Sequence, residues 1–528
     1  MLRGKGASFG RKGVLLRGKG AFLRRKGGPR EADRTGRQRP RRGFGELVGA
    51  DGYGHCLPAT ERQIGPHCSD IACGPKGVRF GHPCLASSFC SATFDLDLIK
   101  GVTRVTTIMA YAKFSPLRLA GALAALVVLG ETMRLAVHKD VFPVATANDF
   151  HFYWEALQRF LTDPKTLYLP ALDCDLRGFL YPPPAIAMFL PFAGLSQVTA
   201  LVLFRIIGVL GMVASVWVLA RIFEGRGIAL RPWDRASLLI VALALGPHYT
   251  NMLYGQVNTF LLLDCLAFRL LLDRRRPMIA GAVVAAGAWF KVYPLLCLVF
   301  VLLWERRAHD TRRLLIGFGA TAALVPVICC PFVPFDLYRV YATDVFPVLG
   351  SRTFQNILNQ SLLAASTRTG APMGNFIDWE LCPFSVVPAT WARVLNGAVA
   401  LGSVVGLGLW ARHGDAARRL ASYFCLLATI PIVSTLGWAY VYVLAVPALL
   451  LALRCAPKSA AAYLLLLGAS VSYLVPATHA LRPLLRLPEI LRQVVYDRYL
   501  LTTFMVCGLL VFTGWVALPK EESSPGRL

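Results

Sequence analysis

Charged residues are scarce in this sequence, and acidic residues are the scarcest of them. Asp, Glu, Lys and Arg make up only 16% of the 528 residues, whereas 55% of the residues are hydrophobic. Soluble globular chains contain about 25% charged residues on average. This deficit argues against a disordered protein and an ordinary soluble enzyme, and it predicts an integral membrane protein.

The sequence also lacks the short motifs of nucleotide-dependent and metal-dependent enzymes. It contains no Walker loop, no Gly-x-Gly-x-x-Gly after a strand, no His-Glu-x-x-His and no nucleophile elbow. No segment is long enough for a soluble nucleotide-binding domain. An ATP-driven pump and a nucleotide-sugar enzyme with such a domain are therefore disfavoured.

Basic residues outnumber acidic ones by 56 to 30, which gives a formal net charge of +26. In a soluble protein this excess would suggest a nucleic-acid partner. Here it lies largely in the N-terminal segment and in short connectors between apolar runs, where cytoplasmic retention of Lys and Arg explains it. We therefore expect membrane lipids, and no nucleic acid, as partners.

Residues 1–108 differ from the rest of the chain. The sequence Leu-Arg-Gly-Lys-Gly-Ala occurs at 2–7 and again at 16–21, in a segment rich in Gly and Arg. Such composition cannot bury a core, so this segment is predicted to be disordered, or to lie upstream of a true start at Met109. Its His and Cys residues match no standard zinc spacing, and we expect no metal site. The second domain is then a membrane domain, residues 109–528.

Apolar runs long enough to span a bilayer recur along this second domain. A spanning helix needs about 20 apolar residues. The interval 183–197 is too short and predicts an interfacial or re-entrant helix, whereas 278–304 carries Lys291 and Pro294 at its midpoint and predicts a hairpin that turns inside the membrane. The candidate spans are 117–137, 198–222, 236–253, 257–272, 312–332, 392–411, 419–436, 438–454, 459–476 and 500–517.

The basic connectors orient these spans. Placing them in the cytoplasm puts the N-terminus inside and the two long loops, 138–182 and 333–389, outside. We therefore expect an all-α, polytopic protein of a bacterial plasma membrane, with about 10–13 transmembrane helices and long extracytoplasmic loops. Long loops of this kind are usually functional.

The first long loop contains two candidate site residues. Asp149 lies in an aromatic-rich stretch, and a carboxylate beside apolar walls has a raised pKa that suits a general base. Asp149 could equally be the N-cap of a helix. Tyr181 begins an aromatic–proline run, which could form the wall of a sugar or lipid site or simply start an interfacial helix.

Lys291 is the most informative single residue. A cation at the bilayer centre costs roughly 2.5–3.5 kcal/mol on insertion scales, so it normally faces a polar cavity or an anion. A lipid phosphate is one such anion. Snorkelling to the interface is the alternative, but the position of Lys291 at the midpoint of its apolar interval makes it difficult.

Polar and aromatic side chains also occur in other loops and turns. Gln256 and Asn258 present amides between two spans, where a merely polar turn is equally consistent with the pattern. Asn359 lies among other amides in the second long loop. Trp438 and Tyr440 lie between two later spans, where interfacial aromatics are expected in any case.

Taken in order, these motifs resemble the family of membrane-embedded, polyprenyl-phosphate-mannose-dependent α-1,2-mannosyltransferases, glycosyltransferase family 87 of the GT-C class. The resemblance covers roughly residues 115–515 and rests on the order of the motifs. The motifs are Asp149-Phe150 with Tyr153, Tyr181-Pro182-Pro183, Gly255-Gln256-Val257-Asn258, Lys291-Val-Tyr-Pro294, Asn359-Gln-Ser361 and Trp438.

The resemblance implies a GT-C fold and an inverting transfer of mannose from a polyprenyl-phosphate-linked donor to a lipid or glycan hydroxyl outside the cytoplasm. Asp149 would be the base, and Lys291 a phosphate partner, with no cofactor and no divalent metal. Family members often have a His where this chain has Tyr440. The remaining implied substrate-binding residues are Phe150, Tyr153, Tyr181, Gln256, Asn258, Asn359, Trp438 and Tyr440.

Two other classes of protein remain as alternatives. A transporter of a lipid-linked or small anionic substrate would also explain an intramembrane cation and broken helices. Transporters usually carry an internal repeat, and the two halves of this chain show none. A structural scaffold would leave Lys291 unexplained.

Overall fold

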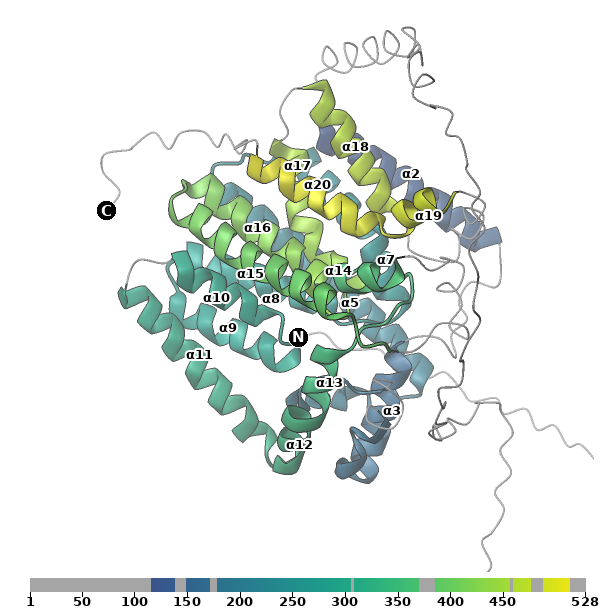
Figure 1. Ribbon diagram of the computed structural model, residues 1–528, viewed down its shortest axis with the longest axis vertical. Coiled ribbons are helices and arrows are strands. Elements are labelled where there is room, and N and C mark those ends of the chain that lie inside the picture. Colours follow the sequence, from purple (N-terminus) through teal and green to yellow (C-terminus); the bar gives the residue numbers. More distant parts are fainter. Residues whose placement is uncertain are drawn as a thin grey trace, which may run out of the picture. The chain divides into compact units, whose positions relative to one another are not determined.

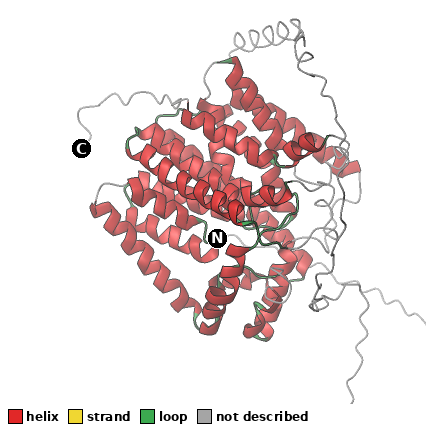
Figure 2. Cartoon of the chain, viewed as in Figure 1, coloured by secondary structure: helices red, strands yellow, loops and turns green. Residues whose placement is uncertain are grey.

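The computed structural model describes seven stretches of the chain, all within the compact unit Cys73–Leu528. The two-domain division at residue 108, and everything expected of residues 1–108, lie outside the described residues. The described part is helical throughout, with two isolated antiparallel bridges and no strand (Figure 2). The described stretches are 115–137, 149–170, 178–304, 308–369, 385–455, 459–475 and 488–512.

In the described part of the chain, every candidate span coincides with one helix or with two consecutive helices (Figure 1). The all-α fold expected from the sequence is thus confirmed. These elements are α2 (Pro116–Val137), α5 (Gln197–Gly225), α6 (Pro232–Ala244) with α7 (Gly246–Leu253), α8 (Asn258–Asp273), α11 (Ala308–Cys329), α15 (Thr390–Arg412), α16 (Ala416–Val433), η5 (Ala439–Ala445) with α17 (Val446–Cys455), α18 (Ala460–Leu474) and α20 (Arg498–Phe512).

Helix length and composition support a polytopic membrane protein. Among the described residues, the four helices α5, α11, α15 and α16 are long and apolar enough to cross a membrane. A fifth span results if α6 and α7, which are bent by 50° at the break around Leu245, count as one. Seven further apolar helices have 10–17 residues. The total of 10–13 spans stays a prediction.

The two harder intervals and the long loops form short helices. The interval 183–197 holds a 3₁₀ helix in place of a span. The described parts of the two long loops are also largely helical. These elements are α3 (Asp149–Thr162), η1 (Pro164–Thr166), η2 (Pro183–Phe192), α9 (Pro277–Phe290), α10 (Pro294–Trp304), α12 (Phe335–Val340), the π turn η3 (Tyr341–Val345), α13 (Phe346–Ser351) and α14 (Leu362–Arg368). Another short helix, α19 (Glu489–Tyr496), precedes α20.

The chain reverses direction at Lys291, between α9 and α10. Gly281 lies against the backbone of Leu314, and Trp289 donates its indole N–H to the carbonyl of Ala322 at 3.0 Å. Because both residue numbers increase together along these contacts, α9 and α11 run in the same direction. The helix between them, α10, must run back, so the helical reversal predicted from the sequence is present. Its place within a membrane stays a prediction.

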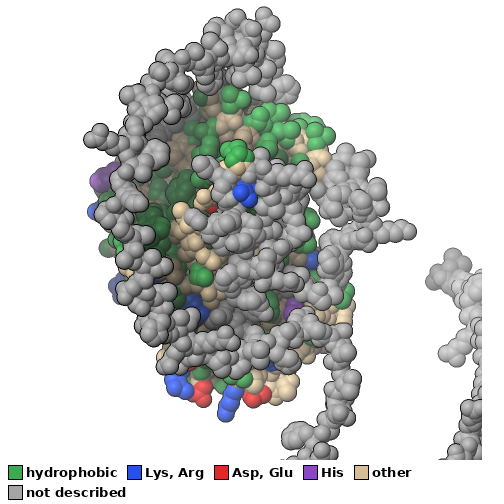
Figure 3. Space-filling view, turned by 45° about the vertical axis from the view of Figure 1, so that its right-hand side comes forward, with side chains coloured by type: hydrophobic (Ala, Val, Ile, Leu, Met, Phe, Trp, Pro, Cys, Tyr) green, Lys and Arg blue, Asp and Glu red, His purple; other side chains and the backbone are tan. Residues whose placement is uncertain are grey.

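Apolar side chains cover much of the described surface. Leu210 and Trp217 of α5 and Val327 and Ile328 of α11 are each more than half exposed, as lipid-facing residues would be. On the face shown in Figure 3, Lys, Arg, Asp and Glu side chains gather at the lower end. The loop helices α3 and α12 lie at that end in Figure 1. The charged end of the molecule thus contains helices from both long loops.

Candidate active site

The carboxylate of Asp149 is held by residues from two distant segments. Asp149 is the first residue of α3 and is partly buried. Its Oδ2 accepts hydrogen bonds from the Nε2 of Gln256, in the α7–α8 turn, and from the hydroxyl of Tyr440, in η5, at 2.9 Å for the latter. Both bonds end on the same oxygen. Within the described residues, Oδ1 makes no hydrogen bond and can accept a proton from a ligand.

The position of Asp149 follows from the aromatic face of α3. Phe150, Tyr153, Leu157 and Phe160 recur at helical spacing and are buried. This face packs against η2 and α5, so the first turn of α3 is fixed close to the α7–α8 turn. Burial raises the pKa of Asp149, and the hydrogen bonds from Tyr440 and Gln256 and the charge of Lys291 only partly oppose this effect.

A chain of phenols continues from Gln256. The hydroxyl of Tyr153 donates to Gln256 Oε1 at 2.8 Å and lies 2.6 Å from the hydroxyl of Tyr181. The hydroxyl of Tyr181 is also 3.3 Å from Gln256 Oε1. The amide of Gln256 is therefore oriented, because its oxygen faces two phenols and its nitrogen faces Asp149.

The α7–α8 turn has a conformation that favours glycine. Gly255 has φ +64°, and a Cβ there would lie 2.7 Å from the Cβ of Phe150. Asn251 closes the turn: its Nδ2 donates to the carbonyl of Gln256 at 2.9 Å, and its Oδ1 accepts from the Nδ2 of Asn258 at 3.1 Å. These contacts aim the side chains of Gln256 and Asn258 toward the same region.

Lys291 lies where α9 and α10 meet, and its nearest described partners are neutral groups, although the charge of Asp149 also acts on it. Its Nζ donates to Asn258 Oδ1 at 3.2 Å and lies 5.6 and 4.8 Å from the ring centres of Tyr181 and Tyr293. Tyr293 is itself anchored, because its hydroxyl is 2.8 Å from the Oγ of Ser434. Among the described residues, Lys291 has no ion-pair partner. Its surroundings therefore suit an anionic ligand.

Three of the expected substrate-binding residues pack against other parts of the protein and support the residues of the site. Phe150 is 1% exposed and packs in an aromatic cluster with Phe204 and the phenylalanines of η2. Asn359 is fully buried, and its Nδ2 donates to the carbonyls of Phe354 and Thr435. Trp438 pairs with Asn359 through an isolated bridge, and its ring stacks on Tyr440 with centres 6.2 Å apart.

Several residues that the motif analysis missed hold the site together. Asn251 and Ser434 are not among the predicted substrate-binding residues, although both contact site residues. The carbonyl of Tyr254 accepts from the backbone N–H of Phe150 at 3.1 Å, and its ring lies 6.0 Å from Tyr440. Tyr254 immediately precedes the Gly255 motif, which is the one local signal that could have pointed to it.

The described residues contain no group of three His, Cys, Asp or Glu side chains that could hold a metal ion. Among the described residues, the site offers one carboxylate oxygen that makes no hydrogen bond, several amide and phenol groups, and one lysine that belongs to no ion pair. A carboxylate and an ammonium group held close together can accept a proton and bind an anionic leaving group.

Comparison with known proteins relates this site to one family. Residues 179–392 match the family model of glycosyltransferase family 87. The matched segment includes Tyr181, the α7–α8 turn and Lys291, but neither Asp149 nor Tyr440. No curated protein and no solved structure matches the chain.

Proposed function

We propose that the chain transfers mannose from a polyprenyl-phosphate donor to a hydroxyl of a lipid or glycan acceptor, because residues 179–392 match the model of glycosyltransferase family 87. The observation that carries the proposal is the arrangement of Asp149, with one carboxylate oxygen held by Tyr440 and Gln256 and the other making no hydrogen bond within the described part of the chain. Lys291 acts electrostatically on Asp149 and forms no ion pair with any described residue. The mannose and the lipid donor come from the family resemblance.

The proposed reaction needs only groups that the site contains. Asp149 Oδ1 accepts the proton of the acceptor hydroxyl as its oxygen attacks the anomeric carbon from the face opposite the phosphate. The bond between the anomeric carbon and the phosphate oxygen breaks, and the phosphate leaves with that electron pair, so the configuration inverts. Lys291 offsets the charge that develops on the phosphate. The raised pKa of Asp149 favours proton acceptance near neutral pH.

The surroundings of the site suit a donor with a sugar, a phosphate and a long apolar chain. Phenols and amides can bind sugar hydroxyls, and exposed apolar helices can contact a polyprenyl chain in the bilayer. We place the reaction on the extracytoplasmic side of a bacterial plasma membrane, with the N-terminus in the cytoplasm, because the connector charges favour that orientation.

The test is transfer of radiolabelled mannose from polyprenyl-phosphate-mannose by membranes that express the chain, prepared from a strain without the activity. We expect Asp149→Asn to lower transfer by at least about a hundredfold, as loss of a general base does. Asp163→Asn is the matched control, because Asp163 lies in the same loop but only caps η1. Equal transfer by Asp149→Asn and Asp163→Asn would remove Asp149 from the mechanism.

A further inference from the structure

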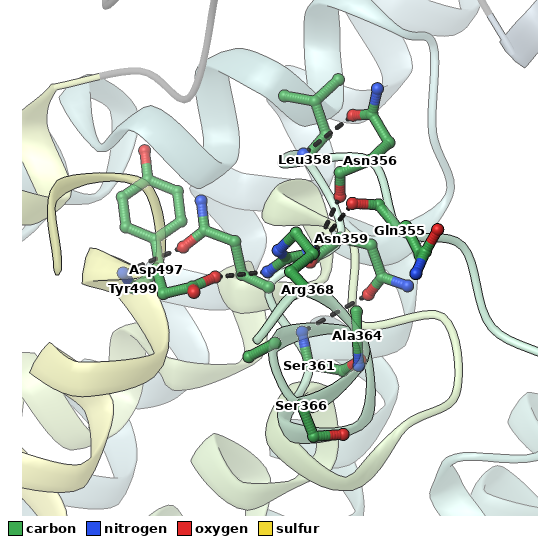
Figure 4. A network of polar contacts seen from close by, with 12 residues as sticks. Gln355, Asn356, Leu358, Asn359, Ser361, Ala364, Ser366, Arg368, Asp497 and Tyr499 are labelled. Carbon is green, nitrogen blue, oxygen red and sulfur yellow. Dashed lines mark hydrogen bonds and ion pairs between the residues drawn. The ribbon is translucent and has the colours of Figure 1, made fainter. Parts of the chain in front are cut away.

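A buried ion pair far from Asp149 in the sequence is unused by the proposed reaction. Arg368, at the end of α14, donates from Nη2 to Asp497 Oδ1, between α19 and α20 (Figure 4). Arg368 is 1% exposed and Asp497 is 3% exposed. Removing two such charges from water is costly unless their geometry is well satisfied. The question is what this costly arrangement holds in place.

Arg368 holds the loop that precedes its own helix. Its Nη1 is shared among the carbonyls of Gln355, Asn356 and Asn359, at 3.2, 3.1 and 2.9 Å. Figure 4 shows the loop curled around the guanidinium group, with Asp497 on the opposite side. A lysine in place of Arg368 could pair with Asp497 but could not match this planar, multidentate arrangement. Arg368 therefore determines the path of residues 355–359.

The same loop is bound to the segment that leads to Tyr440. Gln360 donates its backbone N–H to the carbonyl of Gly437 at 2.9 Å, and Ala439 donates to the carbonyl of Leu358 at 2.6 Å. The segment 437–439 ends one residue before Tyr440, whose hydroxyl donates to Asp149. A shift of the loop would therefore move Tyr440 relative to the carboxylate.

Two further contacts tie the loop to α20 and to η5. The backbone N–H of Tyr499, in α20, donates to Gln360 Oε1 at 3.0 Å, and the hydroxyl of Tyr442 donates to the Gln360 carbonyl. The loop is thus clamped by Arg368 and Asp497 at one end and by Gln360 at the other. Neither Arg368 nor Asp497 contacts Asp149, Tyr440 or Lys291.

We propose that Arg368 and Asp497 are positioning residues, which align the Tyr440 hydroxyl with Asp149 through the loop 355–361. This inference rests on the proposed function, because it concerns the base of that reaction. It assigns a role to a contact between α14 and the α19–α20 junction that no motif of the sequence suggested. The polar side chains of the loop serve mainly to hold its fold.

The pH dependence of kcat distinguishes positioning from mere stability. The base acts when ionised, so kcat falls as the pH drops through the pKa of Asp149. The hydrogen bond from Tyr440 favours the ionised form and lowers this pKa, so its loss moves the acid limb to higher pH. The other titratable groups that interact electrostatically with Asp149 are Tyr153, Tyr181, Tyr254 and Lys291.

The experiment measures kcat against pH for the purified full chain and its variants. Tyr440→Phe should move the acid limb to higher pH. Arg368→Lys and Asp497→Asn should move it in the same direction and lower kcat at neutral pH by about tenfold or more, as misaligned catalytic groups do. In the double variant Arg368→Lys/Tyr440→Phe, the acid limb should move no further than in Tyr440→Phe alone. Both changes remove the same hydrogen bond, from the Tyr440 hydroxyl to Asp149.

Arg269→Lys is the matched control. Arg269 is also buried and also pairs with an aspartate, Asp273, but both residues lie at the end of α8 that is remote from Asn258. It should lower the yield of folded protein at most and leave the acid limb unmoved. If Arg368→Lys does not fold, Asp497→Asn and Tyr442→Phe carry the test, since each loosens the same loop.

The positioning role is overturned if Arg368→Lys folds and its acid limb does not move. It is also overturned if Asp497→Asn and Tyr442→Phe fold and their acid limbs do not move. Asp149→Asn, assayed in parallel, separates this failure from failure of the proposed function. Transfer that survives in Asp149→Asn contradicts the base assignment itself. Transfer that disappears there, beside unmoved limbs in the loop variants, contradicts only the inference about Arg368 and Asp497.

Discussion

Charged and polar side chains differ in how many hydrogen-bond or ion-pair partners the surrounding structure gives them. Asp149 Oδ2 has two donors, Asn359 has three acceptors within reach, and Arg368 has four. Lys291 has one amide oxygen and two aromatic faces, and no described carboxylate pairs with it. A ligand is expected where a charge is left without its counterion, so Lys291 marks the proposed phosphate position more clearly than the other residues.

We predict that Lys291→Met raises the KM for the lipid-phosphate donor roughly ten- to a hundredfold, since a hydrogen bond to a charged group contributes about 1.5–3 kcal/mol. Lys291→Arg should retain part of the affinity, because the positive charge remains. Initial rates against donor concentration give the KM.

Lys165→Met, which removes an exposed lysine from the first long loop, is the control for this prediction. The phosphate role of Lys291 is contradicted if Lys291→Met and Lys165→Met have the same KM for the donor.

At the scale of elements, short irregular segments place the site residues, whereas long helices support them. Gln256 lies in a turn, Lys291 at a helix break and Tyr440 in a 3₁₀ helix. Prolines begin α6, α9 and α10, where the missing N–H leaves no bond unmade. The chain also bends by 50° between α6 and α7, at Leu245, just before Gly246-Pro247. The site is thus built where helices start and stop.

We predict that Gly255→Ala destabilises the α7–α8 turn by about 1–3 kcal/mol, because a left-handed backbone and a close approach to Phe150 both penalise a Cβ. The midpoint of thermal unfolding in detergent measures this effect. Gly194→Ala is the control, since a Cβ at Gly194 meets nothing within 4 Å. Equal midpoints for the two variants would show that the turn tolerates a side chain.

At the scale of the whole molecule, the apolar helices and the polar loops have different roles. The helices α5 and α11 expose apolar side chains, and helices of the two long loops lie at the charged end. A lipid-linked donor and a hydroxyl acceptor need this combination, because one ligand partitions into the bilayer and the other can approach from water. The carboxylate that we propose as the base belongs to a loop helix, and the proposed phosphate partner to a helix hairpin.

We predict that residues 109–528 carry the full transfer activity, because all the described site residues lie within them. Membranes containing this truncated chain should transfer sugar at the same rate per molecule as the full chain, with and without EDTA. EDTA should have no effect, because the leaving group carries a single phosphate that Lys291 can bind. A truncated chain that inserts normally but is inactive would assign a role to residues 1–108.

The sequence by itself determined the helical fold, the approximate bounds of the apolar helices and the reversal at Lys291. Each of these depends on local properties, namely the length of an apolar run, a proline and a cation within it. Only the tertiary structure decided which polar residues meet. Tyr440 reaches Asp149 across 291 residues and Asp497 reaches Arg368 across 129, and no local pattern encodes such pairs. The buried roles of Phe150 and Asn359 likewise follow from packing, because a side chain's neighbours depend on the whole fold.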